Sequence, residues 1–326
     1  MKNGLNRFIF YTQQIETLLE KAAQQKDPAL WLFNNDARKP FFMLEGLARL
    51  YAHMHNPKRF KKLKGHFKLI EDGLGQIDHY HSLSVAFASN KNIPEESVKY
   101  IKTQFERSLT NLNKVLIKEK WLSKDNARIL KINKKLENAD WLKSDKETEA
   151  ISLIYNSAVA DISHFAFDTN FHFDNVEEDV HELRRKLRWL SIYPQALQGV
   201  VQYSSDTKSP AHLKKYLTKE IIDSPFNKFP PVDPGSSILY INKNYFLALS
   251  WMIDRLGKLK DEGLLIAGVS EALMENSVHK ENKLAEAELL LGKKQRKMQA
   301  ILKEAASDTK TFFEENNLQY LISKTK

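Results

Sequence analysis

Four side chains that could bind an anion lie within a short segment that runs from Asn175 to Leu190. At 100° per residue, these four lie within about 100° of one another on a helix. They are His181, Arg184, Arg185 and Arg188. Guanidinium groups one turn apart match successive phosphate oxygens, because each presents a planar fork and keeps its charge. An imidazole adds one more donor, and a bound phosphate favours its protonated form. We interpret this cationic face as a candidate polyanion-binding surface.

The neighbouring residues predict the helix that must position this face. Asn175 is a good N-cap, Glu178 follows three residues later as in a capping box, and acidic residues fill the first turn. The helix should run to about Tyr193, since Pro194 discourages continuation. Its other side is apolar and should face the core: Leu183, Leu187 and Leu190. A solvated helix surface is the alternative interpretation, but arginines without interleaved carboxylates on their face favour binding.

Helical periodicity recurs along the chain and predicts an all-α fold. Apolar residues in 94–120 are spaced by three and four residues, which lays one stripe along a helix. A Ser-Pro start signal precedes a predicted helix at 212–222, and 280–315 has the pattern of one long amphipathic helix. Two segments lack this pattern. They are 165–175, interpreted as a connection with phenylalanines at alternate positions, and 204–237, an insertion with half of the 10 prolines.

The composition favours a polyanionic partner and excludes several kinds of site. Lysine and arginine number 50 against 41 aspartates and glutamates, a net charge of +9 that attracts anions before specific contacts form. The 326 residues contain no cysteine, which excludes disulfides, zinc–thiolate sites and cysteine nucleophiles. The amino-terminal residues lack the unbroken apolar run of a signal peptide, and no window is typical of a membrane span. We expect a cytoplasmic protein with no membrane partner.

The cationic segment also resembles the signature of a known family. His181, Arg184 and Arg188 match the pattern His-x-x-Arg-x-x-x-Arg of the CHAD family, a histidine-bearing α-helical domain. Members carry a later helix with the pattern Leu-Gly-x-Leu-x-Asp, which residues 256–261 match. The resemblance implies two pseudo-repeated helical-bundle halves around a basic groove or pore. It also implies binding of inorganic polyphosphate without catalysis and without a cofactor.

A two-half family requires an internal repeat, and two offsets in the sequence are consistent with one. Residues 74–77 stand 182 positions before 256–259 with a similar Leu-Gly pattern, while Arg38 and Lys39 stand 146 positions before their second-half counterparts. The two offsets differ by 36, about the length of the proline-rich insertion.

We therefore divide the chain into a first half at 1–150 and a second half at 151–326, the latter with the insertion near 204–237. The first half departs from the signature, because Asn35 replaces the histidine and Phe42 replaces the second arginine.

Further cations are nominated by their chemistry alone. A dense basic run precedes the Leu-Gly helix of the first half, and a shorter one follows Pro210 in the second. Together with the signature residues and with Arg38 and Lys39, they complete the predicted polyanion-binding set. They are Lys58, Arg59, Lys62, Lys214 and Lys215.

Two other functions remain open at this level. A helical scaffold for a protein partner is one alternative, and it is favoured because the first half lacks two of the signature cations. A carboxylate–histidine metal site is suggested by Glu178 and His181, with Asp161 and His164 as the nearest second pair, but ferritin-like sites need further glutamates. The nucleotide-binding loops and the hydrolase elbow are missing, so no enzyme is predicted. Specific nucleic-acid recognition is not expected, because aromatic residues do not alternate with the arginines.

Overall fold

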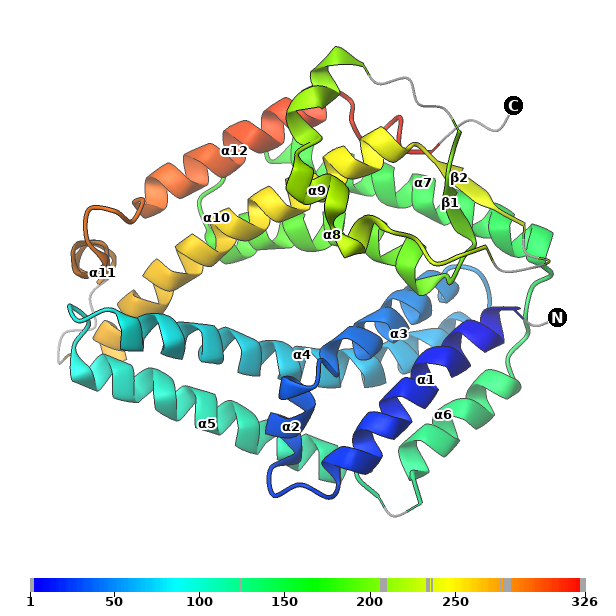
Figure 1. The fold of residues 1–326 in the computed structure, drawn as a ribbon, viewed down its shortest axis with the longest axis horizontal. Coiled ribbons are helices and arrows are strands. Elements are labelled where there is room, and N and C mark those ends of the chain that lie inside the picture. The colour runs from blue at the N-terminus through cyan, green and yellow to red at the C-terminus, as the bar shows by residue number, and fades with distance from the viewer. Residues whose placement is uncertain are drawn as a thin grey trace. The chain divides into compact units, whose positions relative to one another are not determined.

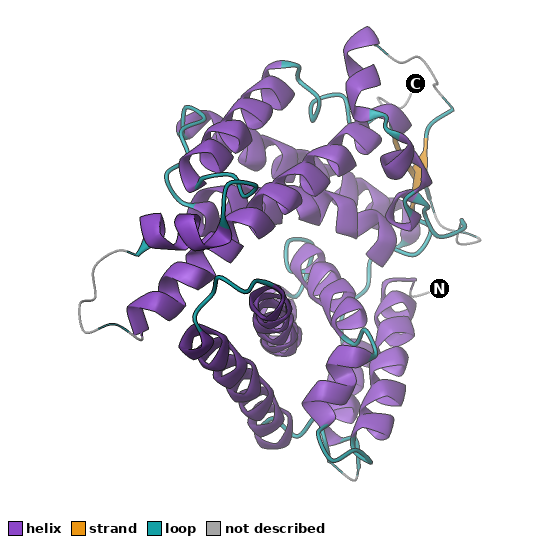
Figure 2. Cartoon of the chain, turned by 60° about the vertical axis from the view of Figure 1, so that its left-hand side comes forward, coloured by secondary structure: helices purple, strands orange, loops and turns teal. Residues whose placement is uncertain are grey.

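The computed structural model describes residues 3–123, 125–205, 210–232, 235, 237–275, 277 and 283–322. Within these residues, helices make up nearly all of the regular structure, and only two short strands are present (Figure 2). The prediction of an all-α fold is confirmed. No helix in this part of the chain combines the length and the apolar character needed to cross a membrane.

The chain forms two compact units, each assembled from segments that are far apart in sequence. Unit 1 comprises Met1–Lys143 with Gly268–Leu291, and unit 2 comprises Ser144–Ala267 with Gly292–Lys326. The division at residue 150 expected from sequence differs from this arrangement, because it assigns 268–291 to the second half.

Unit 1 is built around two long antiparallel helices and their neighbours (Figure 1). Its helices are α1 (Asn3–Ala22), α2 (Pro28–Asn34), α3 (Arg38–Tyr51), α4 (Pro57–Ser89), α5 (Glu95–Lys118), α6 (Ala127–Glu137) and α11 (Leu284–Leu291). Helix α4 packs against α3 and α5. The helix predicted at 94–120 is confirmed as α5, and its apolar stripe is buried as expected: Ile101, Leu109, Leu112 and Leu116.

An aromatic cluster fixes the start of α4 in unit 1. Phe8 on α1, Tyr51 on α3 and Phe60 on α4 surround Trp141, with all ring centroids between 5.4 and 5.9 Å apart. Edge and tilted contacts of this kind add to the gain from burial. The cluster therefore anchors the helical turns that carry the basic run of α4.

Unit 2 places α8 between α7 and the long helix α10. Its elements are α7 (Ser144–Asp168), a π-helical turn (Val176–His181), α8 (Glu182–Ala196), β1 (Val201–Tyr203), a 3₁₀ helix (Ala211–Tyr216), α9 (Lys219–Asp223), a 3₁₀ turn (Pro225–Asn227), β2 (Leu239–Ile241), α10 (Lys243–Glu275, whose residues from Gly268 on belong to unit 1) and α12 (Met298–Glu314). The predicted apolar side of α8 is buried: Leu183, Leu187 and Leu190. The Tyr155 hydroxyl on α7 donates to the Leu190 carbonyl.

At the start of the cationic helix, the predicted N-cap Asn175 is confirmed, but Glu178 is not the partner residue of the capping box. The Asn175 side chain accepts from the backbone N–H groups of Glu177 and Glu178, at 2.7 and 3.1 Å. The reciprocal bonds come from Asp179, not Glu178: its carboxylate accepts from the N–H groups of Asp174 and Asn175, both at 2.8 Å. The helix opens with a π turn, which adds one residue per turn and shifts the reciprocal position by one.

The end of this helix also differs from the prediction. Helix α8 continues through Pro194 to Ala196. Proline removes one intrahelical bond, which the last turn of a helix tolerates better than its middle.

Three other segments depart from the predicted helices. The long helix expected at 280–315 is broken, because Gly292 adopts a φ of +84° between α11 and α12. The helix expected at 212–222 is a 3₁₀ helix followed by the short α9. The alternating phenylalanines expected to form a connection at 165–175 begin within α7, which extends to Asp168.

The proline-rich insertion is bounded by the two strands that the sequence did not reveal. Strands β1 and β2 pair in parallel, with Val201 opposite Leu239 and Tyr203 opposite Ile241. Three residues are too few to show a period of two.

Candidate anion-binding surfaces

Arg184 lies against the backbone of α10 at Gly257. Its Nε–H donates to the carbonyl of Ile253 at 3.1 Å. A Cβ added at Gly257 would stand 2.9 Å from the same Nε and 3.3 Å from Nη2. The absence of a side chain at residue 257 therefore gives the guanidinium the space that it occupies.

Arg38 of unit 1 lies in the same way against Gly75 of α4. A Cβ added at Gly75 would stand 2.6 Å from Arg38 Nη2. Arg38 Nε donates to a Glu71 carboxylate oxygen at 2.8 Å, and Nη1 pairs with Asp78 at 3.1 Å. Each unit therefore seats an arginine of a shorter helix on a glycine of a 33-residue helix.

The residues at corresponding positions of α4 and α10 differ in charge. Glu71 stands 182 residues before Ile253, the same offset as between the two glycines, so a carboxylate in unit 1 takes the place of a carbonyl acceptor in unit 2. Asp78, by the same offset, corresponds to Lys260. Two carboxylates thus neutralise Arg38, while the corresponding positions of α10 carry an isoleucine and a lysine.

His181 and Arg185 of the α8 face have carboxylates of the same helical segment beside them. His181 Nδ1 lies 3.4 Å from Glu177, and Arg185 pairs with Glu182 at 2.5 Å. Lys186 also approaches Glu182, at 3.4 Å. The expectation that the face holds no interleaved carboxylates is therefore wrong for Arg185, because Glu182 lies three residues before it on the helix. Arg188, one turn after Arg184, is half-buried.

The other nominated cations lie on separate elements. Lys39 is exposed in the first turn of α3, and Lys58, Arg59 and Lys62 lie at the start of α4. Lys214 and Lys215 are exposed on the 3₁₀ helix of the insertion.

Lys215 is engaged in structural contacts. Its Nζ pairs with Glu315 at 2.5 Å and lies 4.9 Å from the ring centroid of Tyr216. It therefore ties the insertion to the end of α12.

A row of cations that the sequence analysis did not single out faces α4 from α6. Arg128 Nη1 lies 3.4 Å from Nε2 and 3.5 Å from Nδ1 of the His66 ring. Arg59 donates from Nη1 to the carbonyl of Asn138, just after α6. The row on α6 consists of Arg128, Lys131 and Lys135, and the row on α4 consists of Arg59, Lys62 and His66.

These two rows had a signal in the sequence. Each has spacings of three and then four residues, the same spacing as His181, Arg184 and Arg188. That spacing places three side chains on one helix face.

The pKa values of two groups reflect this clustering of positive charge. Burial, together with the positive charges of Arg128, Lys135 and Lys62, lowers the pKa of His66 to about 4, against the opposing effect of Glu119. Burial also lowers the pKa of Lys135, as do the positive charges of both rows. The groups thus lie close enough to repel one another.

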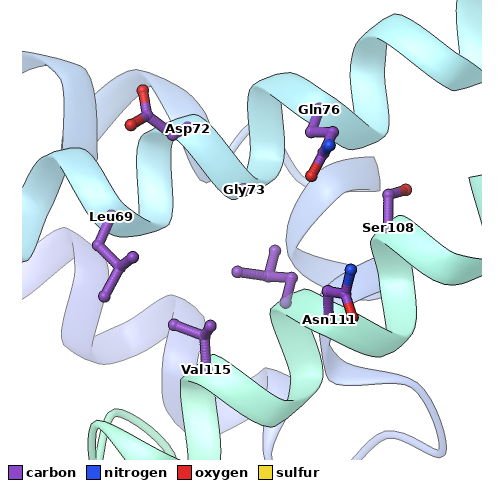
Figure 3. Close-up of a pocket in the computed structure, with 8 residues that line it drawn as sticks. Leu69, Asp72, Gly73, Gln76, Ser108, Asn111 and Val115 are labelled. Carbon is purple, nitrogen blue, oxygen red and sulfur yellow. The ribbon is translucent and has the colours of Figure 1, made fainter.

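A pocket of about 460 Å³ opens between α4 and α5 (Figure 3). Polar and apolar side chains line it: Leu69, Asp72, Gly73, Gln76, Ser108, Asn111, Leu112 and Val115. No cation is among them, and the Asp72 carboxylate points away from α5 and pairs with Lys68 at 2.5 Å. The pocket is therefore separate from the cationic surfaces.

The metal alternative gains no support from the arrangement of the side chains. In the part of the chain that the structure describes, no group of three or more histidines, aspartates and glutamates is placed to hold a metal ion. His181, proposed to pair with Glu178, instead approaches Glu177.

Comparisons with protein-family models, curated proteins and solved structures give no match to this chain.

Proposed function

We propose that the chain binds a polyanion, with inorganic polyphosphate as the preferred ligand, and catalyses no reaction. The proposed contacts come from the α8 face: His181, Arg184, Arg185 and Arg188. The CHAD resemblance supports this function at the same residues. The observation that carries the proposal is the fixed position of Arg184 against Gly257.

A fixed arginine favours anion binding for an entropic reason. Ordering a long, free side chain costs about 0.5–1.5 kcal/mol on association. The hydrogen bond from Arg184 Nε to the Ile253 carbonyl holds the guanidinium plane before a ligand arrives. Part of the side-chain entropy is therefore already lost when the chain folds, and binding loses less.

The carboxylates on the face oppose binding. Glu182 must give up Arg185 when a phosphate takes its place, which reduces the gain from that contact. We therefore expect Arg185 to contribute less to affinity than Arg184, whose guanidinium plane is already held by Ile253.

The test is a titration of long-chain polyphosphate into the full chain at two salt concentrations, with duplex DNA of matched charge as competitor. Log affinity should fall linearly with log salt concentration, with a slope that reports the phosphates engaged. Equal affinity for DNA would exclude the preference for polyphosphate.

Substitutions test the location of the site. Arg188→Ala should weaken binding by about 1.5–3 kcal/mol, which is about 10- to 100-fold. Lys310→Ala removes an exposed charge from α12 of the same unit and serves as the matched control. Equal effects of the two changes would exclude the α8 face.

A second candidate function is supported by the neutralised arginine of unit 1. Because Glu71 and Asp78 pair with Arg38, that helix pair offers a mixed-charge surface suited to a protein partner. Recovery of one stoichiometric protein by cross-linking, with no response to polyphosphate, would favour this scaffold function.

A further inference from the structure

We propose that a second anion-binding site lies between α4 and α6 of unit 1 and takes a compact oligophosphate of the triphosphate kind. The site consists of the two facing rows, hereafter the α4–α6 rows: Arg59, Lys62, His66, Arg128, Lys131 and Lys135. The inference does not depend on the function proposed for α8, because it rests on different residues in the other unit.

The geometry brings the α4–α6 rows together from two helices. Arg128 contacts the His66 ring, and Arg59 reaches the carbonyl of Asn138 that follows α6. The first and last side chains of each row are seven positions apart, which is about 10 Å along a helix axis. An anion between the rows can therefore meet donors from both sides.

Most of the positive charge in the rows has no carboxylate beside it. Arg128 is the exception, since Glu119 accepts from its Nη2 at 2.6 Å and the Glu119 carbonyl accepts from its Nε at 2.7 Å. In the described parts of the chain, no ion pair engages Lys62, Lys131 or Lys135. A bound anion would reduce the repulsion between the positive charges of the two rows, which persists in the folded chain without a ligand.

This site lies on a different face of α4 from Gly75. At 100° per residue, Gly75 is turned by about 140–180° from each of Arg59, Lys62 and His66. The helix thus presents Gly75 to Arg38 on one side and the basic row on the other.

The size and chemistry of the rows select the ligand. A singly charged anion carries too little charge to balance six basic side chains, whereas a chain of phosphates places charge along and across both rows. Single-stranded nucleic acid is bound by stacking of bases on aromatic side chains as well as by charge. The only phenylalanine, tyrosine or tryptophan of the row segments 57–66 and 127–138 is Phe60, which is fully buried. We therefore assign the site to the phosphate groups alone.

His66 provides a direct readout of occupancy. Its pKa of about 4 keeps the imidazole neutral at pH 7, through burial and through Arg128, Lys135 and Lys62, with Glu119 acting in the opposite direction. A multivalent anion favours the imidazolium, so the pKa of His66 should rise on binding. Binding is then accompanied by proton uptake and strengthens as the pH falls toward the pKa of the bound state.

The experiment titrates inorganic triphosphate into the full chain by calorimetry and follows the His66 ring by NMR. Lys131→Ala and Lys135→Ala should each weaken binding by about tenfold or more. Lys102→Ala is the matched control, because Lys102 is an exposed lysine of the same unit but lies on α5, outside both rows. Its effect should stay within about twofold. In the wild type, saturation should raise the pKa of His66 by about one unit or more.

The outcomes separate this proposal from its alternatives. Equal weakening by Lys102→Ala, an unchanged pKa of His66, or equally tight binding of duplex DNA would each overturn it. If ATP binds as tightly as inorganic triphosphate, the ligand includes nucleotides, whereas weaker binding of ATP assigns the site to inorganic chains. The pKa of His66 reports only on the α4–α6 rows, whereas Arg188→Ala tests only the α8 face, so failure of the α8 proposal and failure of this one give different results.

Discussion

Gly75 of α4 lies so close to Arg38 of α3 that a Cβ at residue 75 would stand 2.6 Å from the guanidinium Nη2. Helix interiors disfavour glycine by about 1 kcal/mol relative to alanine, so this position gives up intrinsic helix stability to admit the arginine. We therefore expect glycine-to-alanine substitutions at two positions of α4 to change the free energy of unfolding in opposite directions.

Gly75→Ala should destabilise the protein, and Gly65→Ala should stabilise it. The new methyl group at residue 75 displaces Arg38 from Glu71, and overpacking of this kind costs about 1–3 kcal/mol. Gly65 lies in the same helix with nothing within 4 Å of an added Cβ, so it should gain about 0.5–1 kcal/mol. Urea midpoints measure both changes. A rise of the midpoint for both variants would show that Arg38 moves at no cost.

Asp179→Ala should destabilise the start of α8 by about 1 kcal/mol more than Glu178→Ala. Both changes remove one negative charge from the first turn, so their effects on the helix dipole are similar. Only Asp179 accepts from two backbone N–H groups, those of Asp174 and Asn175. Thermal unfolding of the two variants provides the comparison, and equal losses would contradict the assigned cap.

Tyr155→Phe should cost about 1–2 kcal/mol, because it leaves the buried carbonyl of Leu190 without its hydroxyl donor. Tyr240→Phe removes a hydroxyl from an exposed residue of β2 and should stay within about 0.5 kcal/mol. Urea denaturation followed by tryptophan fluorescence distinguishes the two. A loss of similar size in both variants would mean that the α7–α8 bond contributes little.

Glu45→Gln should stabilise the protein at pH 8 and have little effect at pH 4. Burial of Glu45 raises its pKa, as do Glu71 and Asp72, while Lys68 and Arg49 lower it. A carboxyl group with a raised pKa in the folded state binds more protons folded than unfolded, so its ionisation costs stability as the pH rises. Glutamine does not ionise and avoids this cost. The difference in urea midpoint between variant and wild type, measured from pH 4 to pH 8, should grow with pH. A constant difference would contradict the raised pKa.

Local signals predicted the helices that depend on neighbours in sequence. The stripe of α5 and the cap at Asn175 follow from spacing and from backbone hydrogen bonding within a few residues. The capping-box residue differs from the predicted one because the helix begins with a π turn, whereas the prediction assumed an α turn. The break at Gly292 was missed because a single glycine within a helical pattern does not reveal its sign of φ.

The α4–α6 rows show that residue spacing alone does not reveal a site shared by two helices. The sequence contains both sets of spacing, but nothing local states that α6 lies opposite the start of α4. That pairing follows from tertiary packing, in which α1 packs against both α3 and α6 and the Phe60 cluster holds the first turns of α4. The α8 face was easier to find, because its four cations lie on consecutive turns of one segment.

The division of α10 has a practical consequence for anyone who wishes to study one half by itself. Its residues up to Ala267 belong to unit 2, while those from Gly268 onward belong to unit 1 together with α11. A truncated chain that ended at Lys143 would lose Glu271, which accepts from Tyr100 of α5 at 2.8 Å, and the contact of Gly268 with Leu83 of α4. The two units are therefore not modules that can be expressed by cutting at one position. Point substitutions in the whole chain are the way to assign activity to either unit.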